Sequence, residues 1–195
     1  MADYIVSPPT QEPIALADVK LHIRQDPSVG TAEDTWLNSR ITMARERGEY
    51  ITQRKFITQT WGISLDGFPP AIELLRAPIQ SVLTVQYLDQ SQIVQLLDPA
   101  SYVTDFTGLT GYIVPRFGRI FPLPYPEINS VTVRYVCGYG DTPASVPESI
   151  KDWMCLIIED AYRNRGTTVH LGRGEKLEIN PEFDAILYPF ITPRV

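Results

Sequence analysis

The feature that most constrains this sequence is a change of hydrophobic period near Phe56. Before this point, apolar residues recur at alternating intervals of four and three, which places them on one stripe of a helix. That stripe consists of Leu37, Ile41, Ala44, Gly48 and Ile51. After Phe56, residues alternate up to Leu65 with the period of two that is typical of a strand. Because no obvious turn residues separate the two patterns, a long helix is expected to lead directly into a sheet.

The rest of the chain predicts an α+β fold, in which a small α-helical bundle carries a long β-rich insertion between its second and third helices. A chain of 195 residues can bury most of its apolar surface in one domain. We expect helices at about 16–24, 34–54 and 147–165, a β insertion at about 56–140, a single domain over residues 1–166, and an extended C-terminal tail or arm over residues 167–195.

The two long helices are expected to share one core. The third helix has its own apolar stripe, which should face the stripe of the second helix. This stripe consists of Ile150, Met154, Ile157 and Ala161. Trp61, just beyond the change of period, is expected to be largely buried where the helix meets the sheet.

Strand patterns differ in strength along the chain. The first dozen residues contain three prolines, so they are expected to form an arm or an edge strand. Residues 78–89 and 92–98 have the alternation of a hairpin, and residues 131–136 have that of a strong strand. Weaker extended pieces, interrupted by glycines and prolines, are centred on Tyr102, Ile113 and Ile120.

Residue types that carry catalysis or bind metals are sparse. The two histidines, His22 and His170, lie in no helical pair and near no cysteine cluster. Cys137 and Cys155 are too few and too far apart for a disulfide framework or a thiolate metal site, so both are interpreted as small buried hydrophobic residues. We therefore expect no catalytic residues, no cofactor and no metal.

One alternative of a different class stays open at this stage. The β insertion contains aromatic and charged residues that could line a polar pocket for a small molecule or a substrate. These residues are Tyr87, Tyr102, Asp105, Arg116 and Tyr135. Such residues more often furnish the surface of a sheet, so an enzyme or a ligand-binding domain is the less favoured hypothesis.

The net charge of the chain also limits the classes of partner that it is expected to bind. Seventeen basic and 23 acidic residues give a net charge of −6, which argues against a dedicated nucleic-acid-binding protein and against docking on an anionic membrane. The basic residues of the long helix alternate with Glu33, Glu46 and Glu49, which favours an ion-paired face over a nucleic-acid groove. No apolar run approaches the length of a membrane span and the N-terminus lacks the features of a signal peptide, so we expect a cytoplasmic chain.

Six segments, taken in order, resemble head-tail connector proteins of tailed phages and phage-like particles. They are EPIALADVKLHIR (12–24), ARERGEYITQRKFITQTW (44–61), FPPAIELLRAPIQSVLTVQYLD (68–89), LDPASYVTD (97–105), VTVRYVCGYGDTPASVPESIKDWMCLII (131–158) and AYRNRG (161–166). None of these segments is a catalytic signature. The family fold is a helical bundle with a β insertion, which agrees with the order of patterns found here.

The resemblance implies a structural adaptor at the virion neck, present in the host cytoplasm during assembly. In this family a homo-oligomeric ring, commonly of twelve copies, lies beneath the portal protein and joins the DNA-filled head to the tail. The expected partners are the portal, neighbouring copies of the chain, and stopper or tail proteins. DNA would pass through the lumen without sequence-specific binding. A neck stopper or a tail-completion protein is the alternative within the same particle.

The C-terminal tail contains two apolar clusters that are too small to form a core of their own. They consist of Phe183, Ile186 and Leu187, followed by Phe190 and Ile191. These residues are predicted to contact the portal or a neighbouring subunit. Packing of the tail on its own domain is the other possibility, because C-terminal segments are often held in that way.

Overall fold

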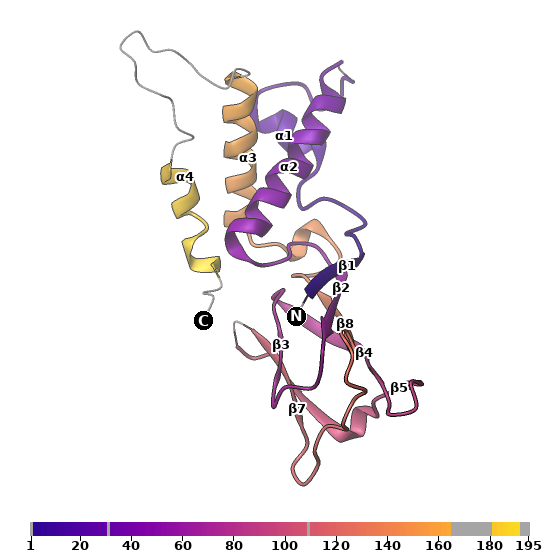
Figure 1. The fold of residues 1–195 in the computed structure, drawn as a ribbon. Coiled ribbons are helices and arrows are strands. Elements are labelled where there is room, and N and C mark those ends of the chain that lie inside the picture. The colour runs from indigo at the N-terminus through magenta and orange to yellow at the C-terminus, as the bar shows by residue number, and fades with distance from the viewer. Residues whose placement is uncertain (1, 31, 109, 165–180, 192–195) are drawn as a thin grey trace, which may run out of the picture. The chain divides into compact units, whose positions relative to one another are not determined.

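The computed structural model describes residues 2–30, 32–108, 110–164 and 181–191, and its α+β fold is shown in Figure 1. The chain divides into two compact units. We call Met1–Thr10 with Gln53–Asp141 the β unit, and Gln11–Thr52 with Thr142–Val195 the helical unit. The predicted α+β class is confirmed, and each unit has its own set of buried apolar residues.

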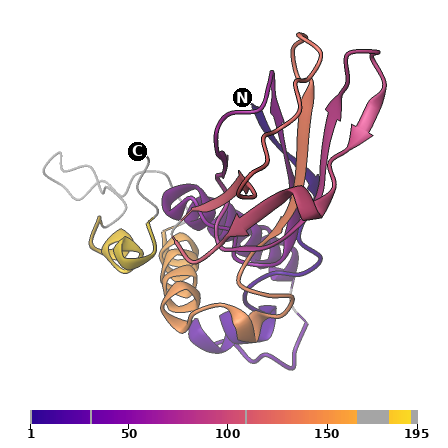
Figure 2. The ribbon, with the colours of Figure 1, turned by 90° about the horizontal axis from the view of Figure 1, so that it is seen from below.

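The helical unit has four α-helices and two short 3₁₀ turns among its described residues. The elements are α1 (Leu16–His22), α2 (Asp34–Thr52), η2 (Pro143–Ser145), α3 (Glu148–Arg163), α4 (Pro181–Ala185) and η3 (Tyr188–Phe190). Helices α2 and α3 lie side by side, and α1 packs against both (Figures 1 and 2). Helices α1, α2 and α3 lie within the ranges 16–24, 34–54 and 147–165 in which helices were expected.

The predicted pairing of apolar stripes is confirmed for the central residues of α2 and α3. Leu37, Ile41 and Ala44 of α2 are buried, as are Ile150, Met154 and Ile157 of α3. Ile51 and Ala161, at the C-terminal ends of the two stripes, are only half-buried.

Three charged residues lie deeper in the helical unit than a single apolar stripe predicts. Arg45 and Glu49 are one helical turn apart on α2 and both are buried. Lys20 of α1 is buried too, where its ammonium group donates to Asp34 and to the carbonyl of Val29, both within 2.9 Å. Burial of these charges is tolerated because each one has an ionic or carbonyl partner.

Helix α2 ends at a residue with unusual backbone geometry. Gln53, the residue after the helix, has a positive φ of 57°, in the left-handed region that commonly ends helices. Lys55 then donates its backbone N–H to the carbonyl of Ala77 at 2.8 Å, so the chain has already joined the β unit. A glutamine in the left-handed region supplies the turn, which is why the sequence shows no glycine at this point.

The β unit contains two antiparallel sheets. One has five strands in the order β1-β2-β8-β4-β5, and the other has three in the order β3-β7-β6. The strands are β1 (Ala2–Ser7), β2 (Gln59–Leu65), β3 (Ile72–Leu74), β4 (Ile79–Leu88), β5 (Val94–Leu96), β6 (Tyr102–Asp105), β7 (Gly111–Pro115) and β8 (Val131–Cys137). A further 3₁₀ turn, η1 (Pro99–Ser101), precedes β6. The proline-rich N-terminus is thus an edge strand, β1, one of the two forms predicted for it.

Alternate residues of the central strands form the core of the β unit. Val131, Val133, Tyr135 and Cys137 of β8 are all buried, and they share one core with residues of both sheets. Apolar residues that point inward from two sheets in this way hold the sheets together. The core also includes Ile63, Leu65, Ile72, Leu74, Val85, Leu97, Tyr102 and Ile113.

Two predictions for this unit are wrong. Ile120 lies in no strand but in the long connection between β7 and β8, where it is exposed, because the prolines that follow it prevent regular pairing. Trp61 is half-buried and not largely buried. Its ring has the ammonium of Lys55 at 4.6 Å and the guanidinium of Arg76 at 4.9 Å from its centroid, so polar-tipped side chains cover it.

The ends of the β insertion are joined by pairing of its first and last long strands. Strands β2 and β8 pair from Gln59 opposite Cys137 to Leu65 opposite Val131. Just outside this ladder, Thr58 donates its N–H to the carbonyl of Gly140 at 3.0 Å. Gly138 has a φ of 127° there, and a Cβ atom added to it would lie 2.6 Å from the backbone of Ile57. The close approach of the two ends therefore requires glycine at this position.

We predict that Gly138→Ala destabilises the β unit by at least about 1–3 kcal/mol, since it combines backbone strain with a clash against main-chain atoms. The matched control is Gly67→Ala in the same unit, where an added Cβ would meet its nearest atom at 3.9 Å. Urea unfolding followed by the fluorescence of a variant that keeps Trp61 as its single tryptophan measures both. Equal stability of the two variants would show that the approach of Ile57 and Gly138 is not as close as described.

For the helical core we predict that Ile41→Ala, at a side chain that is 2% exposed, lowers the free energy of unfolding by about 2–5 kcal/mol. Leu21→Ala on α1 removes a side chain that is 69% exposed and should change it by less than about 0.5 kcal/mol. Far-ultraviolet circular dichroism in urea, which is dominated by the helices, is the measurement. A loss below about 1 kcal/mol for Ile41→Ala would contradict the shared core of α2 and α3.

Candidate assembly surfaces

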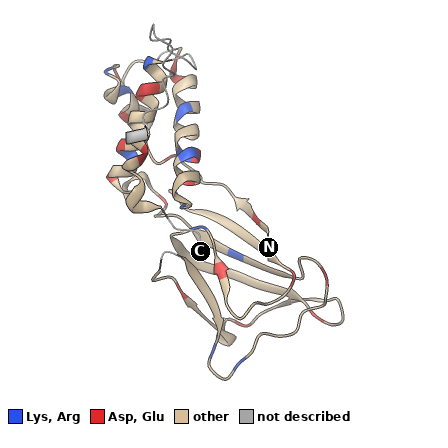
Figure 3. Cartoon of the chain, turned by 60° about the vertical axis from the view of Figure 1, so that its left-hand side comes forward, with Lys and Arg blue, Asp and Glu red and all other residues tan. Residues whose placement is uncertain are grey.

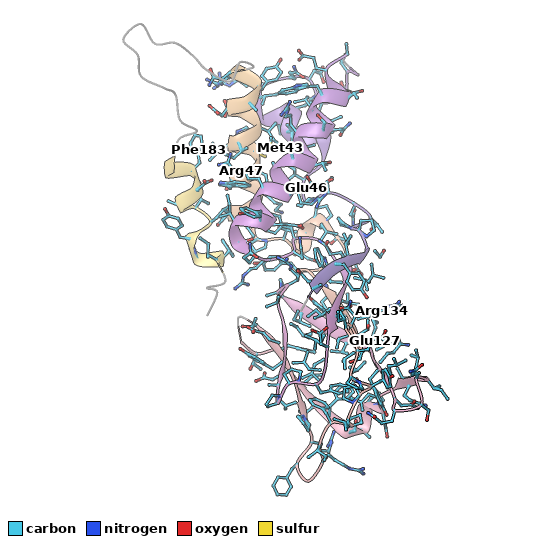
Figure 4. The ribbon with its side chains drawn as sticks, viewed as in Figure 1. Met43, Glu46, Arg47, Glu127, Arg134 and Phe183 are labelled. Carbon is cyan, nitrogen blue, oxygen red and sulfur yellow. The ribbon has the colours of Figure 1, made fainter. Side chains whose placement is uncertain are left out.

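The described part of the C-terminal tail packs on its own helical unit. The carboxylate of Asp184 in α4 accepts hydrogen bonds from Arg47 of α2 at 3.1 Å and from the indole N–H of Trp153 of α3 at 3.2 Å. Figure 4 labels Arg47 and Phe183, on the neighbouring α2 and α4 elements. Leu187, at the turn after α4, is completely buried. One carboxylate and one leucine therefore anchor this segment.

The five tail residues predicted as contacts differ in how much surface they leave open. Leu187 is buried within the chain, whereas the other four are half-buried: Phe183, Ile186, Phe190 and Ile191. Packing of the tail on its own domain, which the sequence left open, thus occurs for this segment. The four half-buried side chains retain apolar surface that a second protein can cover.

The basic residues of α2 take part in local ion pairs and aromatic contacts. Arg45 pairs with Glu12 at 2.8 Å, and with Glu46 and Glu49 at 3.7 and 3.6 Å. The guanidinium of Arg40 lies 4.9 Å from the ring centroid of Trp36. Figure 3 shows acidic and basic residues interleaved on the helices. The predicted ion-paired face is confirmed for Arg45, whereas Arg47 pairs with Asp184 of the C-terminal segment. Both charges are thus compensated within the chain.

The histidine and the cysteines fill structural positions. His22 lies 3.0 Å from Glu159, which also pairs with Arg163, while His170 is outside the described residues. Cys137 is buried as predicted, but Cys155 is only half-buried. Burial still raises the pKa of the Cys155 thiol to about 11, so this side chain is protonated at neutral pH.

The residues proposed for a small-molecule pocket are divided between the core and the surface. Tyr102 and Tyr135 belong to the apolar core, and Tyr87 packs against it with its ring 5.7 Å from that of Phe68. Burial raises the pKa of the Tyr135 hydroxyl above its ordinary value. Asp105 is exposed and accepts hydrogen bonds from Thr107, which lower the pKa of its carboxyl group. Arg116 is exposed as well. The sequence pattern therefore does not correspond to one polar pocket.

The described residues contain no group of three or more His, Cys, Asp or Glu side chains placed to hold a metal ion. Among the helices described, none has the length and apolar character needed to span a bilayer.

The β unit exposes apolar side chains whose exposure the sequence patterns did not predict. Seven of these side chains lie on β5, on the turn before it, or on the connection between β7 and β8. The seven are Ile93, Val94, Leu96, Phe117, Ile120, Leu123 and Ile128. A charge signal in the sequence could have directed attention here, because Arg116 and Arg119 are the only basic residues between Arg76 and Arg134. Exposed apolar residues on strand edges and loops are candidates for contacts with another protein.

Comparison with solved structures finds the same fold in particles that transfer genes. A chain from the neck of an empty gene transfer agent (GTA) particle, computed with C6 symmetry, has a TM-score of 0.78 and 19% identity. A chain from the virion of a native GTA particle gives 0.79 and 17%, and one from the neck of a native GTA particle, computed with C12 symmetry, gives 0.73 and 15%. Each match covers 100% of this chain and 97% of the other. Neither a protein-family profile nor a curated protein matches the sequence.

We predict that Asp184→Ala loosens the C-terminal segment, since it removes two hydrogen bonds to a charged acceptor, each worth about 1.5–3 kcal/mol. Hydrogen exchange of residues 181–191 should become faster, while exchange in the middle of α3 stays slow. Asp152→Ala, which removes an exposed carboxylate from α3, is the control and should leave both unchanged. Unchanged exchange in Asp184→Ala would mean that Leu187 alone anchors the segment.

Proposed function

We propose that this chain is a structural neck protein of a phage-like particle, and that it acts as the head-tail connector (adaptor) ring beneath the portal. The observation that carries the proposal is the end-to-end likeness to chains of GTA necks and virions, at TM-scores of 0.73 to 0.79 over 100% of this chain. A match over the whole chain includes both units, so the likeness is not limited to a common helical pair. The six connector-like sequence segments support the same role.

The physical features of the chain suit a ring component. An adaptor binds other proteins through extended surfaces, and it needs no deep pocket and no catalytic group. The exposed apolar residues of the β unit and the half-buried apolar residues of the tail are surfaces of this kind. The function of the chain would then depend on its assembly with other proteins. The chain would lie in the host cytoplasm before assembly and at the virion neck afterwards.

The net charge of −6 fits a lumen through which DNA slides. Twelve copies in a ring would carry about −72, which repels a duplex within a Debye length of about 8 Å at physiological salt. A ring of this charge would let DNA pass without sequence-specific binding.

We further propose that the half-buried apolar side chains of the tail contact the portal or a neighbouring subunit. Phe183, Ile186, Phe190 and Ile191 would lose their remaining exposed surface in this contact. Leu187 would contribute by holding the segment in place from within the helical unit. The anchor at Asp184 presents these side chains in a fixed arrangement, which lowers the entropy lost on binding.

The proposal predicts that the purified chain, alone or with portal, assembles into rings of about twelve copies that co-sediment with portal. Phe190→Asp should abolish portal binding or ring formation and leave the melting temperature within a few degrees, because Phe190 is not fully buried in the chain. Leu21→Asp, at an exposed leucine of α1, is the control and should assemble normally. Native mass spectrometry counts the copies.

The same experiment separates the adaptor from its alternatives. A wild-type chain that forms rings and binds tail proteins but not portal would be a stopper or a tail-completion protein. A chain that stays monomeric with portal and with tail proteins would overturn the structural proposal.

A further inference from the structure

The connection that follows β7 forms a short, well-anchored loop that projects a phenylalanine into solvent. Arg119 donates its backbone N–H to the carbonyl of Arg116 at 2.8 Å, and Gly118 at the turn has a φ of 74°. Phe117 is completely exposed, and Ile120 is exposed as well. We call residues 116–120 the tip.

Both ends of the tip are fixed to the β unit. On one side, Arg116 donates its N–H to the carbonyl of Ser101 at 3.0 Å. On the other side, Phe121 stacks on Phe68 with ring centroids 4.7 Å apart, and both rings pack against the apolar core. A loop anchored in this way presents its side chains in a defined arrangement, which favours binding because little entropy is lost.

The tip combines apolar and positively charged groups. Arg116 and Arg119 have no ion-pair partner among the described residues. Figure 3 shows basic residues on the loop at the lower end of the β unit, with acidic residues on neighbouring loops. Burial of a phenylalanine side chain contributes about 1.5–3 kcal/mol, so a partner that covers Phe117 and supplies carboxylates would gain from both properties.

A second face of the same unit has the opposite charge. The exposed strand β5 contributes Val94 and Leu96, which are 63% and 62% exposed. The segment 123–128 lies beside the turn that precedes β5, because Gln90 donates to the carbonyls of Leu123 and Pro124 at 3.1 and 2.8 Å. We call β5 and residues 123–128 the acceptor face.

Carboxylates accompany the apolar groups of the acceptor face. Asp89 accepts hydrogen bonds from the Ile93 N–H and the Gln95 amide, which lower the pKa of its carboxyl group and keep it ionised at neutral pH. Glu127 is exposed beside Ile128, which is also exposed, and Figure 4 labels this glutamate. Lys and Arg are absent from residues 77–115 and 120–133, so the segments that form this face carry no cation of their own.

From these two surfaces we infer that the tip of one copy inserts against the acceptor face of a neighbouring copy, with Phe117 on β5 and Arg116 and Arg119 beside Glu127. The inference rests on the proposed ring and names one of its contacts. Both surfaces are exposed within one chain, so they do not satisfy each other there. A contact between two different surfaces of identical subunits is the head-to-tail kind that closes rings. Duplex DNA would engage the arginines but would leave Phe117 and Ile120 in water, which makes it the poorer partner.

Charge reversal and its repair test the contact. Arg116→Glu with Arg119→Glu should move the assembly to monomers at a concentration at which wild type forms rings, and Glu127→Arg alone should weaken the rings. The three substitutions together should restore rings, because the pairing is recreated with opposite sign. Leu83→Glu, at an exposed leucine of β4 outside both surfaces, is the control and should assemble as wild type does. An unchanged melting temperature confirms that each variant folds.

Cross-linking identifies the residues that meet. In a Cys155→Ser background, Phe117→Cys and Val94→Cys chains should form an oxidised dimer only when mixed, since Cys137 is buried. Three results would overturn the inference while leaving the ring intact. They are rings that still form after the charge reversal, a Phe117→Cys chain that cross-links only to itself, and a charge reversal that removes only DNA or portal binding. A wild type without rings, alone or on portal, would instead remove the proposed function and this contact with it.

Discussion

The β unit depends on the way its two ends are held together. The chain enters through β2 and leaves through β8, and these strands are adjacent and antiparallel, with Gln59 opposite Cys137. The hydrogen bond from Thr58 to Gly140 and the close approach of Ile57 to Gly138 continue this pairing beyond the ladder. Because entry and exit lie side by side, a segment of almost ninety residues, Gln53–Asp141, can be inserted between two helices that pack on each other.

Two units with separate cores leave a large surface relative to their size, which suits a protein whose task is to bind others. The helical unit buries Leu187 of its own tail, yet leaves other apolar side chains of the tail half-exposed. In the β unit, the partly buried Phe121 packs against the core at the base of the tip, and Phe117 is exposed at its end. In both places an anchored residue lies next to an exposed one in sequence, so the surface is prearranged before any partner arrives.

Hydrophobic period was sufficient to predict the elements that pack through regular stripes. The stripes of α2 and α3, the β4-β5 hairpin and the buried face of β8 follow directly from the sequence, because each depends on spacing alone. Features that depend on partners distant in sequence were missed. The burial of Glu49 depends on its ion pair with Arg45. The ring of Trp61 is covered by the cations of Lys55 and Arg76 and not by apolar side chains, which leaves it half-buried.

The candidate surfaces were predictable to a smaller extent. The tail residues stood out because small apolar clusters between prolines need a protein surface to be buried against. Period and composition do not say which surface that is. The anchor at Asp184 depends on Arg47 and Trp153, which are distant in sequence. Ile120 was predicted as part of a strand, since apolar residues in a short extended piece look the same whether they are buried or exposed. Its exposure results from the proline-rich connection that follows, which has no strand to pair with.

The most direct test of the central claim is to locate the chain in intact particles. Particles produced with a tagged copy, with a short tag placed at the exposed Gly30 between α1 and α2, can be labelled and imaged by electron microscopy. If the chain is a neck ring, label should appear at one place in each particle, the junction between head and tail, and cryo-electron microscopy should show about twelve copies there. Label on the capsid shell or at the tail tip, or purified particles that lack the chain, would contradict the account.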